Sequence, residues 1–276
     1  MTSAPFCDLD GLAAAIPDGA KIAVPNYFHG VAMAATRALV RRGVKSLHIV
    51  CVPTSGIQAD VLIGAGGVAA IETSAVALGE YGAAPRFAAA LRDGGLRVLD
   101  ATCPAIHAGL QAGLKGMPFV PLRGLLGTDL LAHRADWKVI ENPFSPGDQV
   151  VVLPAIRPDI GLFHGLSADR EGNVLVGRSR DLVNIAQASH ASFVTVEEVV
   201  DGSLFEDRER AAGVIPAIYI TRIAVAKRGA WPLGLAGRYD ADEAALARYA
   251  AAARTPGGFR AWLDEWLAAA PEPAAA

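Results

Sequence analysis

The sequence is poor in cysteine, methionine and aromatic residues. It has three cysteines, Cys7, Cys51 and Cys103, and none of them lies in a CxxC pattern. Widely spaced cysteines argue against a disulfide framework and are typical of a reduced compartment, so we predict a cytoplasmic protein. The histidines and carboxylates show no HExxH or similar ligand spacing, and the sequence therefore predicts no metal site.

Charge and long apolar runs are also scarce. The 276 residues carry a formal net charge of −3, which argues against nucleic acid as a partner, because contacts with phosphates require a basic surface. No apolar run reaches roughly 18 uncharged residues, so we predict no transmembrane helix and no membrane partner. The first ten residues lack the basic and apolar regions of a signal peptide, and none is predicted.

What the chain does contain is a regular alternation of short apolar and amphipathic segments. Strands are predicted at 21–24, 46–52, 68–73, 96–100, 118–121, 149–153, 159–164, 173–176 and 192–196, with 149–153 next to 159–164. Helices are predicted at 8–16, 31–42, 85–93, 178–189, 241–253 and 258–270, another begins at Cys103, and 59–63 form a helical turn. Residues 124–146 are predicted to be mostly loop, and 199–222 irregular.

This order predicts the α/β class, with an open, mostly parallel sheet and helices on both faces. We predict a single domain over residues 1–270 and a disordered tail at 271–276. Ligands of such sheets lie outside the carboxyl ends of the strands. The predicted site loops are therefore those at 25–30, 53–57, 74–84, 101–103 and 124–129.

Cys103 stands at the start of a predicted helix, between Thr102 and Pro104. Proline favours the first helical turn, where free N–H groups and the helix dipole stabilise an anion and lower the pKa of a thiol. Two interpretations stay open: a nucleophile or acyl-site contact, or a small buried packing residue, as free cysteines often are. His107 lies one turn further along the same helix face and is interpreted as an ordinary helix histidine.

Two more of these loops carry candidate binding residues. Asn26, Tyr27 and His29 form a polar and aromatic loop after the first long strand, suited to orienting a substrate, although ordinary loop chemistry is the alternative. Glu80 lies between glycines on a loop after a strand, and loops carry functional residues more often than cores do. We interpret Glu80 as a wall residue of the site rather than as a general base.

The remaining candidates are two glycine-loop residues and three carboxylates. Gly127 and Thr128 lie where glycines allow backbone N–H groups to point at a carboxylate or thioester oxygen. Glu72, on a predicted strand, is interpreted as a surface residue in preference to a site carboxylate. Glu197 and Glu198 follow a buried strand and are interpreted as a structural or subunit-contact pair.

Several motifs, in their order and spacing, resemble a known family. They are the segments 116–121, 142–147, 150–154, 158–159, 163–164, 169–174, 194–198, 229–230 and 239–240, among them NPFSPG at 142–147. Over roughly residues 8 to 268, the chain resembles the α subunit of the family I CoA-transferases, and that of glutaconate CoA-transferase in particular.

The resemblance implies a fold, a reaction and a partner. The fold is the NagB/RpiA-like CoA-transferase fold, and the α chain pairs with a β subunit to form a heterodimer or α2β2 assembly. CoA moves between an acyl-CoA and a carboxylic acid through a glutamyl–CoA thioester, and the β subunit supplies this catalytic glutamate and most of the CoA site. The resemblance thus implies no catalytic residue in this chain, no permanently bound cofactor and a CoA thioester as substrate.

Two departures from the family pattern keep other functions open. The family has Gly-Gly-Phe or Gly-Gly-Trp where this chain reads Pro25-Asn26-Tyr27, and proline removes a backbone donor. The steroid ring-cleaving hydrolases of the family have a glutamate where this chain has Cys103. The alternatives to transfer are therefore a hydrolase, ring-cleaving lyase or decarboxylase of the same family, or a non-catalytic acyl-CoA-binding subunit.

Overall fold

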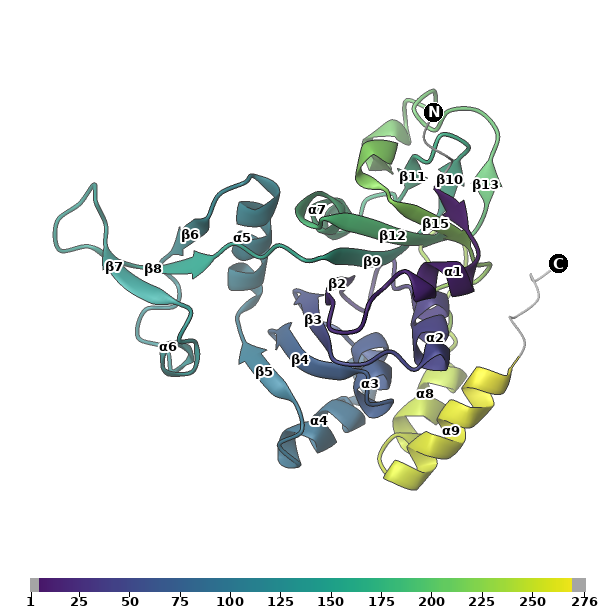
Figure 1. Ribbon diagram of the computed structural model, residues 1–276, viewed down its shortest axis with the longest axis horizontal. Coiled ribbons are helices and arrows are strands. Elements are labelled where there is room, and N and C mark those ends of the chain that lie inside the picture. The colour runs from purple at the N-terminus through teal and green to yellow at the C-terminus, as the bar shows by residue number, and fades with distance from the viewer. Residues whose placement is uncertain (1–4, 270–276) are drawn as a thin grey trace.

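An eight-stranded parallel sheet forms the centre of the computed structural model, which describes residues 5–269 (Figure 1). Its strands, in spatial order, are β1 (Phe6–Cys7), β15 (Arg222–Val225), β12 (Ala191–Val196), β9 (Ile160–Gly165), β2 (Lys21–Pro25), β3 (Leu47–Val52), β4 (Val68–Thr73) and β5 (Arg97–Asp100). From β2 the chain proceeds outward through β3, β4 and β5, and after β9 it proceeds the other way. The direction therefore reverses between β2 and β9, where a crevice is expected at the carboxyl edge.

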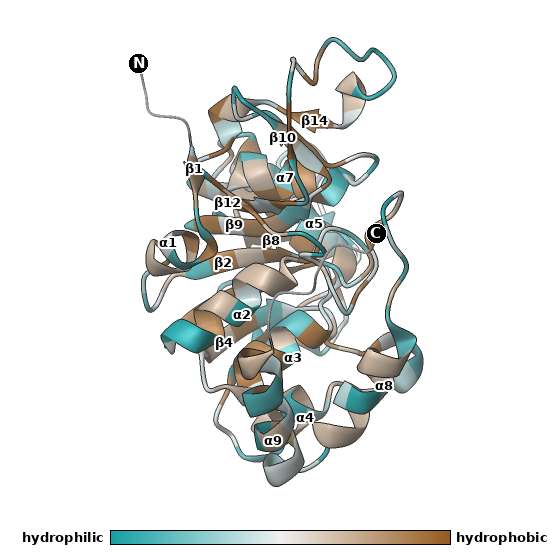
Figure 2. Cartoon of the chain, turned by 90° about the vertical axis from the view of Figure 1, so that its right-hand side faces the viewer, coloured by the Kyte–Doolittle hydropathy of each residue, from teal (hydrophilic) through white to brown (hydrophobic). Residues whose placement is uncertain are grey.

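Helices cover both faces of this sheet, as predicted. One face carries α1 (Leu9–Ala14), α2 (Met33–Arg42), α3 (Ile57–Gly64) and α4 (Pro85–Arg92), and the other carries α5 (Cys103–Leu114) and α7 (Arg180–Ala188). Ile22 and Val24 of β2 pack on the first face, and Ala23 packs on the second. Successive residues of a strand point to opposite faces of the sheet. Because helices bury both faces, the strands are continuous apolar runs. They appear brown in Figure 2.

The C-terminal helices α8 (Glu243–Ala252) and α9 (Pro256–Ala268) form a separate apolar cluster with the ends of α2 and α3. Tyr249, Phe259 and Trp266 pack there against Met33 and Ile57. This packing brings the end of the described chain beside loops that follow β2 and β3.

Two small sheets complete the fold. One has the order β13 (Val199–Val200), β10 (Ser167–Asp169), β11 (Val174–Leu175), β14 (Val214–Ile215). The other is antiparallel, with the order β6 (Phe119–Leu122), β8 (Gln149–Pro154), β7 (Lys138–Glu141), and it projects to the left in Figure 1 together with α6 (Leu130–His133). The short 3-10 helices are η1 (Gly79–Tyr81), η2 (Ala211–Gly213) and η3 (Ala217–Tyr219).

One detail of the predicted order is wrong, and two segments contain more regular structure than predicted. Residues 149–153 and 159–164 are not neighbours, because β8 pairs with β6 and β7, whereas β9 pairs with β2 and β12. Residues 124–146 include α6 and β7, and the predicted turn at 59–63 is part of α3. Apolar runs reveal a buried strand but not its partner, which depends on contacts distant in sequence.

Of the remaining predictions about the organisation of the chain, the structure tests only the one on membrane-spanning helices. Within residues 5–269, no helix is long and apolar enough to cross a bilayer. The predicted tail at 271–276 lies outside the described residues, and the single domain over residues 1–270 stays a prediction.

Candidate functional site

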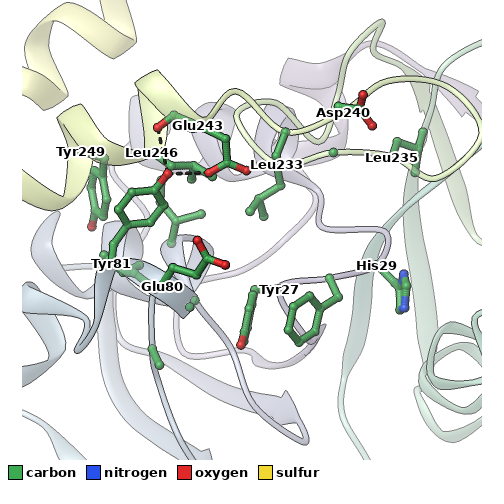
Figure 3. A pocket seen from close by; sticks show the side chains of 18 of the residues that line it. Tyr27, His29, Glu80, Tyr81, Leu233, Leu235, Asp240, Glu243, Leu246 and Tyr249 are labelled. Carbon is green, nitrogen blue, oxygen red and sulfur yellow. Dashed lines mark hydrogen bonds between the residues drawn. The ribbon is translucent and has the colours of Figure 1, made fainter.

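A cavity of about 400 Å³ lies at the carboxyl edge of the large sheet. We call it the edge cavity (Figure 3). Its lining comes from the loops after β2, β3 and β4, from the chain between β15 and α8, and from α8 itself: Tyr27, Phe28, His29, Gly56, Ile57, 77–81, 233–236, 239–241, Glu243, Leu246 and Tyr249. Strand ends that meet at one edge thus form three of its walls.

The loop after β2 forms an aromatic wall of the edge cavity. The rings of Tyr27 and Phe28 lie 3.9 Å apart between centroids, and the Asn26 side-chain oxygen accepts a hydrogen bond from the Phe28 N–H at 3.0 Å. Gly56, at the start of α3, lies against this wall. A Cβ at position 56 would lie 2.9 Å from the Tyr27 Cβ, so only glycine allows the close approach.

The loop after β4 presents Glu80 and Tyr81 on η1. Glu80 is exposed and its side chain lies between Tyr81 and Tyr27 in Figure 3. The Tyr81 hydroxyl donates to the backbone oxygen of Glu243 at 3.0 Å and to the Glu243 carboxylate. This hydrogen bond raises the pKa of Tyr81 to about 12. The contact joins η1 to α8 across the mouth of the cavity.

The remaining wall is the segment 228–249, which we call the cover segment. Its C-terminal end is held by Tyr249, whose hydroxyl donates to the buried Asp60 carboxylate at 2.6 Å. The other Asp60 oxygen accepts from the Phe87 N–H at 2.7 Å. Burial raises the pKa of Asp60, although these hydrogen bonds oppose that shift.

Glu197, directly after β12, holds the N-terminal part of the cover segment. Its carboxylate accepts hydrogen bonds from the Arg228 N–H at 2.7 Å, the Gly229 N–H at 3.1 Å and the Tyr239 hydroxyl at 2.8 Å. It also contacts Nε2 of the fully buried His164 at 2.7 Å. A Cβ at Gly229 would lie 2.5 Å from the His164 ring, so the close approach requires glycine.

These contacts also determine the charge state of Glu197. Burial alone would raise the pKa of Glu197, but the hydrogen bond and charge of His164, with the Arg228 N–H and the Tyr239 hydroxyl, lower it below its ordinary value. The interpretation of Glu197 as a structural residue agrees with this arrangement, since its carboxylate faces backbone and side-chain donors of the cover segment.

A second polar group lies beside the edge cavity and does not line it. The Asn26 side-chain nitrogen donates to Asp181 of α7 at 3.1 Å, and Nδ1 of His107 lies 3.8 Å from the same carboxylate. Cys103 is exposed at the first turn of α5, and its sulfur lies 3.1 Å from the Ser74 hydroxyl. The alternative of Cys103 as a buried packing residue is therefore wrong.

The candidate residues thus fall into three places. Tyr27, His29 and Glu80 line the edge cavity; Asn26 points to Asp181. Gly127 and Thr128 do not line it, because they follow β6, which belongs to the antiparallel sheet.

Glu72 was interpreted as a surface residue, and this is wrong. It is only 5% exposed and pairs with Arg134 at 2.8 Å, and Arg134 is itself 3% exposed. Arg134 also donates to the Asp100 carbonyl at 3.1 Å and lies 4.2 Å from the centre of the Trp137 ring. The pair therefore joins β4 to the segment between α6 and β7.

The cover segment's place in the cavity wall was not predicted from the sequence, although a helix was predicted at 241–253. Leu233, Leu235 and Leu246 supply apolar lining, and Tyr239 and Glu243 supply polar contacts. Locally, these residues look like a loop and an amphipathic helix, and the resemblance at 229–230 and 239–240 assigns them no contact with a ligand. Within residues 5–269, no group of three or more His, Cys, Asp or Glu side chains is placed to hold a metal ion.

An open parallel sheet with a mostly apolar cavity at its carboxyl edge defines an α/β protein whose cavity is suited to a small molecule. The chain belongs to the Coenzyme A transferase family, which matches residues 8–226. This confirms the resemblance and the fold inferred from the sequence.

Individual relatives agree with this assignment. The chain is 31% identical to one subunit of the 3-oxoadipate CoA-transferase of Pseudomonas knackmussii, over 91% of this chain and 89% of that protein. The crystal structure of glutaconate coenzyme A-transferase from Acidaminococcus fermentans superposes with a TM-score of 0.88 at 26% identity, over 95% of this chain and 88% of the other. A variant of the decarboxylase AibA/AibB superposes with a TM-score of 0.84 at 30% identity, over 97% and 99%.

Proposed function

We propose that this chain is the α subunit of a CoA-transferase that moves CoA between an acyl-CoA and a carboxylic acid. The observation that carries the proposal is the edge cavity, whose apolar walls and volume of about 400 Å³ suit an acyl group. Two relatives support it, because one is a subunit of 3-oxoadipate CoA-transferase and the other is a glutaconate CoA-transferase. CoA thioester is then a substrate, with no permanently bound cofactor, and the enzyme works in the cytoplasm.

The cavity favours an acyl group without a second carboxylate. Ile57, Leu78, Leu233 and Leu246 provide apolar contact, and the exposed carboxylate of Glu80 lies among them. A carboxylate at the far end of the acyl group would meet this like charge, which disfavours its ionised form and weakens binding. We therefore expect short or branched monocarboxylic acyl groups to be better substrates than dicarboxylic ones.

Catalysis in this proposal is divided between two chains. The α chain orients the acyl group through the loops after β2 and β4 and the cover segment. A separate β subunit supplies the glutamate that forms the glutamyl–CoA thioester. Asn26, Cys103, Gly127 and Thr128 remain proposed substrate contacts.

The proposed division of catalysis between the two chains is tested by co-purification followed by a thioester exchange assay. The tagged chain is expressed with the β-subunit reading frame beside its own, and thioester exchange is measured for the complex and for each chain alone. We expect exchange only with both chains present. Hydroxylamine or borohydride should trap the glutamyl–CoA adduct on the β chain. Robust turnover by this chain alone would overturn the division of labour.

Hydrolysis or decarboxylation of an acyl-CoA is the second candidate, and two observations favour it. Pro25 lacks the N–H that a glycine at this position would offer to an oxyanion. The thiol of Cys103 is exposed beside Ser74, where it can contact a substrate. Continued turnover with no trapped adduct would support this candidate over transfer.

A further inference from the structure

A second, basic cavity also borders the cover segment and shares Ala236 with the edge cavity. It has a volume of about 790 Å³, and we call it the arginine groove. Its charged lining consists of Arg178, Arg180, Arg210, Arg238, Glu198 and Glu209. Four guanidinium groups against two carboxylates give this groove an excess of positive charge, although the whole chain carries a net charge of −3.

Two of these arginines are free to bind an anion. Arg238 pairs with Glu198, and Arg210 pairs with Asp207 at 3.2 Å. In contrast, neither Arg178 nor Arg180 has an ion pair or side-chain hydrogen bond with any other residue between positions 5 and 269. Their charge is therefore available to a ligand.

The arginines flank the N-terminus of α7. Arg178 precedes the helix, Ser179 is its N-cap residue and Arg180 is its first residue. The Ser179 side chain makes no capping hydrogen bond. The backbone N–H groups of the first turn can therefore donate to another partner. Backbone donors, a helix dipole and two guanidinium groups together form a surface suited to phosphate, and the first-turn carboxylate of Asp181 contacts Asn26 and His107 instead.

A third cavity, of about 350 Å³, adjoins both the arginine groove and the edge cavity. We call it the neck. It lies between β2 and β9, where the sheet reverses direction, and is lined by His29, Gly30, His164 and Leu182 among others. It shares His29, Leu235 and Ala236 with the edge cavity. It shares Leu166, Gly177, Arg178 and Ala236 with the arginine groove.

The three cavities change character in one direction. The edge cavity and the neck are mostly apolar, and the arginine groove is basic. A CoA thioester changes in the same order, from the acyl group through the uncharged pantetheine arm to the phosphates. The chemistry of the protein therefore matches the substrate along its length.

We propose that the arginine groove binds the phosphate groups of the CoA thioester whose acyl group lies in the edge cavity. The proposal rests on the proposed function for the identity of the substrate. It assigns phosphate recognition to this chain, with Arg178 and Arg180 as the main contacts, instead of leaving it wholly to the β subunit. The pantetheine arm crosses the neck, past His29 and Gly30.

The first test measures binding without catalysis. The full-length chain is titrated calorimetrically with adenosine 3′,5′-bisphosphate, which carries phosphate groups of CoA but no acyl group. Each of Arg178→Ala and Arg180→Ala should weaken binding about tenfold, since one charge-assisted hydrogen bond is lost in each. Added salt should weaken wild-type binding as well. The control is Arg260→Ala, an exposed arginine of α9 that pairs with Asp264.

Three outcomes would overturn the proposal. They are no binding by the wild type at low salt, unchanged affinity in the Arg178→Ala/Arg180→Ala double variant, and equal weakening by Arg260→Ala. Both arginines are exposed, and the melting temperature of each variant verifies that it is folded.

The second test uses the complex with the β subunit. The double variant should raise KM for butyryl-CoA about a hundredfold and leave kcat within about twofold, because phosphate contacts act at a distance from the reacting thioester. Turnover of butyryl-pantetheine, which lacks the phosphates, should not change. An equal loss with both substrates would overturn the proposal. If the complex turns over neither substrate, the proposed function fails while the nucleotide titration still decides the role of the groove.

Discussion

Replacing Glu197 with glutamine should loosen the cover segment and weaken acyl-CoA binding. The Glu197 carboxylate faces the Arg228 N–H, the Gly229 N–H and the Tyr239 hydroxyl, all donors, and contacts Nε2 of His164. A glutamine side chain presents one oxygen and one NH2 group. In either orientation of the amide, the NH2 group replaces a carboxylate oxygen that accepted a hydrogen bond. It then faces at least one hydrogen-bond donor, the Arg228 N–H at Oε2 or the Gly229 N–H at Oε1.

The size of the effect follows from these contacts. If the NH2 group takes the place of Oε2, the Arg228 N–H loses its partner, at a cost of about 1–3 kcal/mol. The bonds to the other oxygen weaken as well, because hydrogen bonds to an ionised acceptor are roughly twice as strong as neutral ones. We expect a total loss of about 3 kcal/mol in the free energy of unfolding. For a chain of this size, that lowers the melting temperature by roughly 10 °C.

The assay combines thermal unfolding with steady-state kinetics of the complex. Glu197→Gln should raise KM for acyl-CoA about tenfold with a smaller change in kcat, because the cover segment binds substrate without touching the reacting bond. The control for stability is Glu198→Gln, whose carboxylate pairs with Arg238 on the surface, and which should cost less than about 1 kcal/mol. A Glu197→Gln protein that melts within roughly 2 °C of wild type, with unchanged KM, would refute the reasoning.

The pH dependence supplies an independent check. The folded-state pKa of Glu197 is lowered from its ordinary value of 4.5. The stabilisation is therefore complete above pH 4.5 and is lost as the pH falls through the lowered folded-state pKa. The Glu197→Gln variant has no such group, so its difference in stability from wild type should shrink in that acidic range. A difference that stays constant down to full protonation would contradict the role of the charge.

Three further predictions concern other parts of the site. Arg134→Ala should cost about 1.5–3 kcal/mol in urea unfolding, because the buried Glu72 carboxylate loses its closer partner and keeps Lys21 at 3.7 Å, whereas the double variant Glu72→Gln/Arg134→Met should recover most of this loss. Glu80→Lys should raise kcat/KM for glutaryl-CoA relative to butyryl-CoA about tenfold or more, and an unchanged ratio would remove Glu80 from the acyl wall. Cys103→Ala should leave kcat for exchange within about threefold of wild type, and a loss of about a thousandfold would instead assign the chemistry to the thiol.

The α/β class and most of its elements could be predicted because their signals are local. The run LHIVCV in β3 is apolar at nearly every position, which is typical of a strand covered on both faces. Thr102 and Pro104 marked the start of α5 correctly, since capping and proline preferences act within one turn. The same local rules failed at β8 and β9. Both are apolar, yet they belong to different sheets, and the choice of partner depends on contacts far along the chain.

The residues of the site also fall into those that could be predicted from the sequence and those that could not. The sequence alone pointed to the strand-end loops, so Tyr27, His29 and Glu80 could be selected before their neighbours were known. Only the tertiary structure showed that the cover segment closes the edge cavity, because Leu233 and Tyr249 reach it from about two hundred residues beyond Tyr27. Sequence spacing carries no record of such a contact.

Charge and burial were also decided by the fold. From the sequence, Glu72 was interpreted as a surface residue and Glu197 as a structural or subunit-contact residue, and no prediction was made for Arg178 and Arg180. In the folded chain, Glu72 is buried against Arg134, and Glu197 accepts hydrogen bonds from a segment beyond β15. Arg178 and Arg180 border a groove and have no ion-pair partner among the described residues. The sequence determined which groups can ionise and which segments become strands and helices. The packing of distant segments determined which charges are desolvated, which are paired and which remain for a ligand, because the electrostatic environment depends on three-dimensional neighbours.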